Sequence, residues 1–220
     1  MKLDKISLII LSFNLIEDLK KLLDYLLESV EFQTEEIEII VVDNNSTDGS
    51  KDLLRKYKDK YPKLVIELLC KNVGAGGGRN IGWEIAKYEY IVSIDHDARI
   101  SIADLKQIPS RFRSLPHVGI LGFKIVHPIT NELQNPHGDK ICEIANFHGS
   151  GFAIRKEVVL DTLGMDSEVI YGGMNWNYQL KFIQQDGKFY IFLILLYFTI
   201  VGLIIVKKKL TGTLGIFTVT

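Results

Sequence analysis

Two carboxylates, Asp95 and Asp97, follow an apolar run that ends at residue 94. The run, YIVSI at 90–94, is rich in β-branched residues and is typical of a buried strand. Carboxylate oxygens suit Mg²⁺ or Mn²⁺, and two of them can hold such an ion when substrate phosphates complete its coordination. His96 points away from both neighbours in strand alternation, so we expect it to pack or to face solvent. The pair predicts either a metal–phosphate site or an ordinary turn.

Two further polar clusters follow apolar runs earlier in the chain. Asp43, Asn44 and Asn45 follow IEIIVV, and Asn72 opens the stretch NVGAGGGRN after LVIELL. Glycines let backbone amides approach a phosphate, and Arg79 adds a fixed positive charge, although a flexible connection is the alternative. Parallel strands end at one edge of a sheet, which is where open α/β folds bind ligands. Three polar clusters at one edge therefore favour a ligand site over unrelated turns.

Two common nucleotide-binding motifs are absent from the sequence. Gly74 and Gly76 are followed by Arg79, which leaves the dinucleotide fingerprint without its third glycine. The pattern GxxxxGK[ST] occurs nowhere, which excludes a P-loop. A different nucleotide-binding arrangement is needed if the glycines lie near a phosphate.

The elements that position the clusters alternate between strand and helix patterns. Apolar runs predict strands at 6–12, 37–42, 64–69 and 90–94, with helices between them, the last over 81–87. This order predicts an α/β fold, a mostly parallel sheet flanked by helices on both faces in a single domain. The pattern is weaker after Arg99: we predict strands at 118–126 and 151–155, and helices at 103–112, 156–164 (stopped by Gly164) and 175–187.

Composition narrows the possible functions. The 220 residues are 47% hydrophobic and 24% charged, which is enough for one sizeable core and excludes a disordered chain. The formal net charge of -1 gives no electrostatic reason to expect a nucleic-acid partner. Cys70 and Cys142 have no zinc spacing and make no disulfide framework, so we expect a cytoplasmic setting. The apolar run that follows Asp4 is too short for a signal peptide.

The segment FYIFLILLYFTIVGLIIV, residues 189–206, contains no charged side chain and is followed by three lysines. At roughly 1.5 Å per residue a helix of this length spans about 27 Å, close to a membrane's hydrocarbon core. Its Ile, Val, Phe and Tyr content equally fits one or two buried strands. Both readings stay open: a membrane anchor at the cytoplasmic face, or divergent core strands.

Four stretches in this order and spacing, SLIILSFN, IIVVDNNSTDGS, NVGAGGGRNIG and IVSIDHDA, resemble glycosyltransferase family 2 with its GT-A fold. The later GSGFAIRKEVVLDTLGMDSEVIYGG resembles that family's acceptor-side segment. The resemblance implies a GT-A domain over 1–188, with a nucleotide-sugar half at 1–100 and an acceptor half at 101–188, before the apolar segment 189–220. It also implies inverting, Mn²⁺- or Mg²⁺-dependent transfer of a sugar from a nucleotide-diphosphate donor to a glycan or lipid-linked acceptor.

The same resemblance implies roles for individual residues. Asp43 is expected to recognise the nucleotide base, and Asp95 to approach the ribose or the sugar. Asp97 is expected to ligate the metal, with Asp95 beside it, and a metal there neutralises charge on the departing diphosphate. Asp97 is therefore a candidate catalytic residue. The other expected nucleotide-binding residues are Ser12, Phe13, Asn14, Asn72, Gly74 and Arg79.

The position of the general base departs from the family pattern. Inverting transfer needs a base that deprotonates the attacking hydroxyl, and the family places a carboxylate for this after YGG. Met174 and Asn175 occupy that place here, and an amide cannot accept the proton. One alternative is therefore a catalytically impaired relative that binds a nucleotide sugar or a partner. A nucleotidyltransferase is less favoured, because SFNLIED stands where a glycine-rich basic loop is expected.

Overall fold

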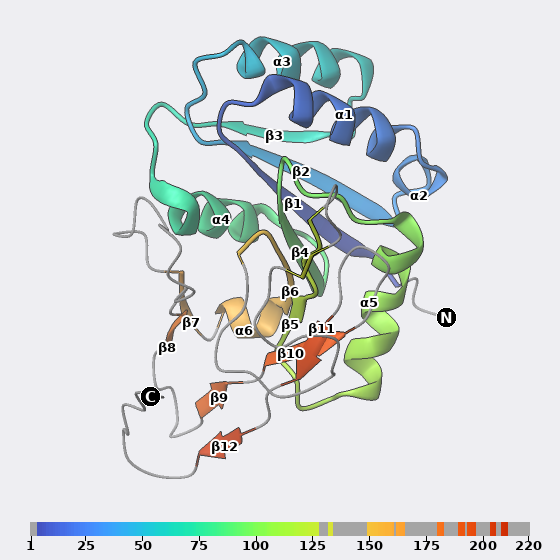
Figure 1. The fold of residues 1–220 in the computed structure, drawn as a ribbon, viewed down its shortest axis with the longest axis vertical. Helices are drawn as coiled ribbons and strands as arrows, with labels where there is room; N and C mark the ends of the chain where they lie inside the picture. Colours follow the sequence, from blue (N-terminus) through green and yellow to red (C-terminus); the bar gives the residue numbers. More distant parts are fainter. Residues whose placement is uncertain are drawn as a thin grey trace.

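The computed structural model describes residues 4–127 and shorter stretches after them, namely 132–133, 149–160, 162–165, 180–182, 189–191, 193–196, 203–205 and 208–210. A sheet of eight strands crosses the described part of the chain in the order β10-β11-β5-β6-β4-β1-β2-β3 (Figure 1). Its strands are β1 (Ile6–Ser12), β2 (Ile37–Asp43), β3 (Val65–Leu68), β4 (Tyr90–Asp95), β5 (Ile120–Phe123), β6 (Gly151–Arg155), β10 (Leu193–Leu196) and β11 (Leu203–Ile205). Two further pairs are β7 (Thr162–Met165) with β8 (Leu180–Phe182), and β9 (Phe189–Ile191) with β12 (Lys208–Leu210).

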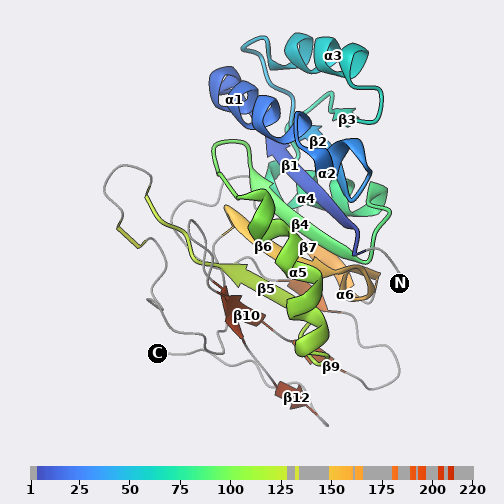
Figure 2. The same ribbon diagram turned by 90° about the vertical axis from the view of Figure 1, so that its right-hand side faces the viewer.

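Helices cover both faces of the sheet. The side chains of β1 and β2 are buried at every position, as expected for strands covered on both sides. Figure 2 shows α1 and α4 on opposite sides of β1, and α4 packs against Ile9 and Leu11. The helices are α1 (Ile16–Leu27), α2 (Val30–Gln33), α3 (Ser50–Lys60), α4 (Gly74–Ile85), α5 (Ile102–Ser114) and α6 (Lys156–Leu160).

The predicted α/β class with a mostly parallel sheet is confirmed. β2 pairs in parallel with β1 and β3, and β4 pairs in parallel with β1. β6 runs antiparallel between β4 and β5. Each of the four predicted N-terminal strands is present, because long apolar runs between turn residues are a strong strand signal.

The glycine-rich stretch is helical, so the interpretation of its glycines as a flexible connection is wrong, and the helix predicted over 81–87 begins earlier than expected. α4 begins at Gly74 and runs to Ile85. A Cβ atom on Gly78 would lie 2.4 Å from Leu11 Cδ1, and one on Gly82 would lie 2.4 Å from Ile9 Cγ2. The glycines one turn apart therefore let α4 approach β1 closely, which outweighs their poor helix propensity.

This close approach predicts that alanine substitutions in α4 destabilise the fold, although alanine is the better helix former. We expect Gly82→Ala to lower the free energy of unfolding by about 1–3 kcal/mol, because overpacking displaces the sheet. Gly78→Ala should cost less, because the Leu11 Cδ1 methyl can rotate away, whereas Cγ2 of the β-branched Ile9 cannot. Urea unfolding of the two variants tests this order; equal or increased stability for Gly82→Ala contradicts the packing.

The second half of the chain departs further from its predicted elements. The helix expected over 156–164 ends at Leu160, and Gly164 lies in strand β7 with φ +75°. Part of the helix expected over 175–187 is strand β8, which pairs with β7. In both segments, pairing between strands that are distant in sequence determines the secondary structure. The local hydrophobic periodicity of the sequence does not reveal such pairing.

The described parts of the apolar segment 189–206 are strands. β10 pairs in parallel with β5, and β11 lies antiparallel to both. The strands at these described positions agree with the β-branched and aromatic content of the segment. Within the described residues, no helix combines the length and the apolar character that crossing a membrane requires.

Candidate functional site

The carboxyl ends of β1, β2 and β4 bring the predicted residues together. In the strand register Ser12 lies beside Asp43, and Leu11 lies beside Asp95. The chain beyond β3 also reaches this edge, because the Leu69 N–H donates to the Asp43 backbone carbonyl at 2.9 Å. Two of the three expected clusters thus follow β2 and β4, the strands on either side of β1, and the third follows β3, the other neighbour of β2.

Asp95 points to the α4 side of the sheet and meets Arg79 there. Leu11 faces α4, and its register partner Asp95 points the same way, because side chains alternate along strands. Arg79 Nη2 lies 2.5 Å from Asp95 Oδ1 and donates to the Gly149 carbonyl at 2.8 Å. Its Nη1 donates to the Ala75 carbonyl at 3.2 Å.

Arg79 is expected from sequence near the nucleotide, and its guanidinium is enclosed instead. The Arg79 side chain is only 1% exposed, whereas that of Asp95 is 29% exposed. The buried Arg79 guanidinium therefore contacts the Asp95 carboxylate from the protein interior. The contact lies where α4, β4 and the segment that enters β6 meet. A charge-assisted contact of this kind fixes the direction of a carboxylate.

Asp97 is available for a metal. Its side chain is exposed just beyond β4, and among the described residues no hydrogen bond or ion pair engages it. No group of three or more His, Cys, Asp or Glu side chains in the described ranges is arranged to hold a metal ion. An ion held by Asp97, with Asp95 beside it, therefore needs further ligands from substrate phosphates and water, which is how Mg²⁺ is commonly bound.

Asn44 holds the segment that leads into α4. Its Nδ2 donates to Asn72 Oδ1 at 2.9 Å and to the Gly74 carbonyl at 3.1 Å. Its Oδ1 accepts from the Val73 N–H at 2.9 Å, and Asn72 Oδ1 also accepts from the Gly74 N–H at 2.8 Å. The two expected nucleotide-binding residues of this segment, Asn72 and Gly74, are thus fixed to the end of β2. Sequence reasoning assigns Asn44 no role of its own; its place in the run DNN is the available signal.

The turn between β1 and α1 is held to the loop after β2. Asn14 and Leu15 adopt positive φ angles of 59° and 56°, which are uncommon for residues other than glycine. The Asn14 N–H donates to Ser46 Oγ at 2.8 Å, and Asn14 Oδ1 accepts from the Thr47 N–H at 3.0 Å. Asn14 therefore braces the two loops rather than capping α1. Phe13, beside it, is half-buried.

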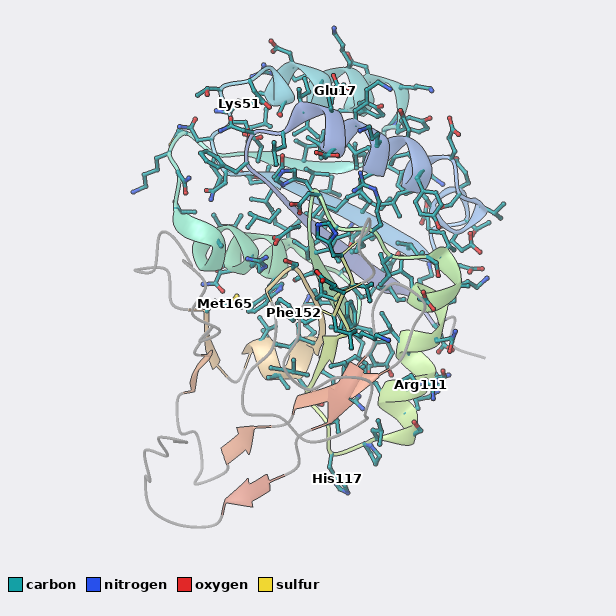
Figure 3. The ribbon with its side chains drawn as sticks, viewed as in Figure 1. Glu17, Lys51, Arg111, His117, Phe152 and Met165 are labelled. Atoms are coloured by element: carbon teal, nitrogen blue, oxygen red, sulfur yellow. The ribbon has the colours of Figure 1, made fainter. Side chains whose placement is uncertain are left out.

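Two charged residues lie near this edge of the sheet, Asp48 in the loop after β2 and Lys51 in the first turn of α3. Asp48 Oδ2 accepts from the Ile16 N–H at 2.9 Å at the start of α1. Burial alone would raise the pKa of Asp48, but hydrogen bonds from Ser50 and Ile16 outweigh it and hold that pKa below its ordinary value. Lys51, labelled in Figure 3, donates to Asn45 Oδ1 at 2.6 Å and to the Leu69 carbonyl at 3.1 Å.

The buried polar residues at the same edge include Ser12, Asp43 and His96. Asp43 Oδ1 accepts from the Ser46 N–H at 2.8 Å. His96 Nδ1 lies 3.1 Å from the Leu11 carbonyl oxygen, and the His96 N–H donates to the same oxygen at 3.1 Å. Of the two expectations for His96, packing is the one observed, because the turn after β4 folds back over the end of β1.

A second link joins α4 to the segment after β6. Asn80 Nδ2 donates to the Met165 carbonyl at 2.8 Å, and Asn80 Oδ1 accepts from the Met165 N–H at 2.8 Å. Figure 3 shows Met165 on the side of α4 away from α1. Among the predicted site residues, Asn175 lies outside the described part of the chain, as do Met174 and the YGG stretch.

Curated relatives match parts of the chain. A poly(ribitol-phosphate) beta-glucosyltransferase of Bacillus spizizenii is 42% identical over 94 residues, which is 42% of this chain and 15% of the relative. The Staphylococcus aureus poly(ribitol-phosphate) beta-N-acetylglucosaminyltransferase TarS is 31% identical over 102 residues, 46% of this chain and 18% of the relative. The chain thus spans well under half the length of these relatives.

Solved structures share the fold. The mannosyltransferase PcManGT of Pyrobaculum calidifontis, in complex with GDP-Man and Mn²⁺, superposes with a TM-score of 0.60 at 21% identity, covering 74% of this chain and 48% of that one. TarS of Staphylococcus aureus in complex with UDP-GlcNAc superposes with a TM-score of 0.58 at 24% identity, covering 71% and 47%. At sequence identities this low, the superpositions show only that the fold is shared.

The family model described as glycosyl transferase family 2 matches residues 7–167. That span begins at the second residue of β1, runs beyond β7 and contains every expected nucleotide-binding residue. It covers well over half of the chain and includes both the strand edge and the α4 segment described above. The chain therefore belongs to glycosyltransferase family 2.

Proposed function

We propose that this chain transfers a sugar, with inversion and with a divalent metal, from a nucleotide-diphosphate donor to a glycan or lipid-linked acceptor. One observation carries the proposal. In a chain of glycosyltransferase family 2, the carboxylates of Asp43, Asp95 and Asp97 lie at the same edge of the sheet. Asp97 is exposed and Asp95 is held from beneath, an arrangement suited to a metal shared with phosphates.

The donor class is supported by the ligands of the structural relatives. PcManGT was solved with GDP-Man and Mn²⁺, and TarS with UDP-GlcNAc. For this chain we propose that Asp43 takes an N–H of the base and that Asp97 holds Mn²⁺ or Mg²⁺. Ser12, Phe13, Asn14, Asn72 and Gly74 would form the walls of the nucleotide site. Arg79 is assigned a positioning role rather than a contact with phosphate.

In the proposed reaction, an acceptor hydroxyl attacks the sugar carbon that is bonded to the diphosphate, and that carbon–oxygen bond breaks. Negative charge develops on the departing diphosphate, and a divalent metal, if bound there, would supply the charge that neutralises it. Asp97 would hold that ion, while Arg79 would keep the Asp95 carboxylate directed at the donor. The proton of the acceptor hydroxyl goes to a general base.

The acceptor and the cellular setting are proposed from curated relatives. One similar protein, from Bacillus spizizenii, is named a poly(ribitol-phosphate) beta-glucosyltransferase, and another, from Borreliella burgdorferi, a cholesterol galactosyltransferase. A polymer or a lipid-linked acceptor fits both names. We place the enzyme in the cytoplasm, or at the cytoplasmic face of a membrane when its acceptor is lipid-linked.

The second candidate is a relative that binds the donor without completing transfer, and Asn175 favours it. In this case Asn175→Asp should raise sugar transfer from near zero while the affinity for the nucleoside diphosphate barely changes, because only the base is restored. Substantial transfer by the unchanged protein contradicts this candidate. Asn177→Asp is the matched control, because it adds the same carboxylate two residues away.

Release of nucleoside diphosphate tests the proposed function itself. The protein is incubated with UDP-glucose, UDP-GlcNAc or GDP-mannose, with Mn²⁺ or with a chelator, and in the presence of a poly(ribitol phosphate) or polyprenyl-diphosphate acceptor. We expect release that needs both the metal and one donor, with the sugar joined in the inverted configuration. Metal-independent release, or retention of configuration in the product, contradicts the proposal.

A further inference from the structure

Asn80 joins α4 to strand β7, which lies beside that helix (Figure 1). Its Oδ1 accepts from the Met165 N–H and its Nδ2 donates to the Met165 carbonyl, each at 2.8 Å. The side-chain amide thus meets β7 as a neighbouring strand would, because it offers an acceptor and a donor side by side to one residue. Met165 is 3% exposed and Asn80 is half-buried, so water competes weakly for these two bonds.

Gly164 allows β7 to approach Asn80 this closely. Its φ of +75° lies in the left-handed region, which glycine adopts without steric cost. A Cβ atom at this position would lie 2.6 Å from Asn80 Oδ1 and 2.9 Å from Asn80 Cγ. A larger residue would therefore displace the Asn80 amide. Two consecutive residues of β7, Gly164 and Met165, are thus fitted to one side chain of α4.

The strand that Asn80 holds leads into the part of the sequence where the base is expected. Met165 is the register partner of Leu180 on β8, so residues 166–179 connect the two strands from this pair onward. Met174 and Asn175, which stand where the family pattern places the base, belong to that connection. Asn80 therefore fixes the backbone from which the connection starts.

The residue before Asn80 holds the carboxylate on the donor side. Arg79 Nη2 lies 2.5 Å from Asp95 Oδ1, and the Arg79 side chain is 1% exposed. Arg79 and Asn80 share a peptide bond within α4, so one turn of this helix fixes both Asp95 and Met165. Because α4 is packed closely against β1, it is a rigid link between these two parts of the chain.

Sugar transfer requires the donor, the acceptor hydroxyl and the base in one geometry, and a displacement of about 1 Å can cost about 100-fold in rate. We propose that Asn80 is a positioning residue, which acts through Met165 to set the connection 166–179 against a donor bound at Asp95 and Asp97. The inference rests on the proposed function, with the acceptor engaged by the second half of the chain. A contact that only stabilises the fold would leave the kinetics of the folded protein unchanged.

Asn80→Leu tests this role, because leucine has a similar size and removes both hydrogen bonds to Met165. Initial rates are measured for sugar transfer to a poly(ribitol phosphate) or polyprenyl-diphosphate acceptor. We expect kcat/KM for the acceptor to fall by about 25-fold, from about fivefold for each lost hydrogen bond, while KM for the donor stays unchanged. Glu84→Leu is the matched control, because it makes a replacement by leucine at an exposed position of α4 and should transfer as the unchanged protein does.

Gly164→Ala tests the same contact from the other side and does not depend on the folding of Asn80→Leu. The added methyl group should displace Asn80 and lower kcat/KM for the acceptor. In the Asn80→Ala background the atoms that the methyl group meets are absent, so Gly164→Ala should lower kcat/KM by a smaller factor than it does alone. Equal factors in the two backgrounds contradict a contact that acts as one unit.

Calorimetry with UDP, GDP and dTDP in Mn²⁺ separates positioning from folding. Asn80→Leu should bind the preferred nucleotide with unchanged affinity and full stoichiometry. Unchanged kcat/KM for the acceptor, or a loss that a reduced fraction of binding-competent protein accounts for, overturns this inference and leaves the proposed function standing. The same kinetics are measured in the Asn175→Asp background if the unchanged protein transfers no sugar, and failure of both proteins to transfer overturns the proposed function together with this inference.

Discussion

Asp97→Asn is expected to remove most of the metal-dependent affinity for a nucleoside diphosphate while leaving the fold unchanged. Asp97 is exposed and, among the described residues, engages no other side chain, so its loss should not disturb the packing. The amide keeps the shape but loses the charge that binds a hard cation. We expect affinity in Mn²⁺ to fall by about 100-fold or more, because even residues that only support a metal ligand contribute up to about 100-fold.

The control for Asp97→Asn is Asp59→Asn, which removes an exposed carboxylate from α3, far from the strand ends. Calorimetric titration should show that the control binds as the unchanged protein does. In the chelator, Asp97→Asn and the unchanged protein should bind equally weakly, because the difference lies in the metal. Equal affinity of Asp97→Asn and the unchanged protein in Mn²⁺ contradicts the metal assignment.

Arg79→Met is expected to give the largest loss of stability among the substitutions considered. Methionine has a similar length but leaves Asp95 and the carbonyls of Ala75 and Gly149 without their donor. Removing one partner of a buried ion pair costs about 3–5 kcal/mol, and the 29% exposure of Asp95 places this case near 3 kcal/mol. Urea unfolding measures the loss directly.

Arg55→Met is the matched control, because Arg55 and Asp52 also lie 2.5 Å apart but are 61% and 75% exposed. An exposed pair contributes at most about 1 kcal/mol. The double variant Arg79→Met/Asp95→Asn should recover part of the lost stability, since it no longer leaves a charge unpaired. Equal losses for Arg79→Met and Arg55→Met contradict the role assigned to the buried pair.

Much of the fold and the place of the site follow from local signals in the sequence. The strands that end at Ser12, Asp43 and Asp95 are long apolar runs bounded by turn residues, and parallel topology then forces their ends to one edge. Strand pattern and topology together are therefore sufficient to predict that Asp43 and Asp95 lie at the same edge of the sheet.

Local signals do not show which partners these side chains take. Gly78 and Gly82 are poor helix formers, and their place in α4 against β1, where a Cβ would clash with Leu11 or Ile9, is a long-range contact. Arg79 is expected near a phosphate because it adds a positive charge beside the glycines, yet its side chain is buried and Asp95 compensates its charge. The burial of His96 depends on the chain folding back onto Leu11, a contact between residues 85 positions apart.

The most direct test of the central claim is a calorimetric titration of the unchanged protein with UDP, GDP and dTDP, each in Mn²⁺ and in chelator. A metal-dependent donor site predicts that one of the three binds preferentially and that chelation strongly weakens this binding. Binding that is equally tight in the chelator, or no binding of any of the three in Mn²⁺, contradicts a metal-dependent donor site at this edge of the sheet.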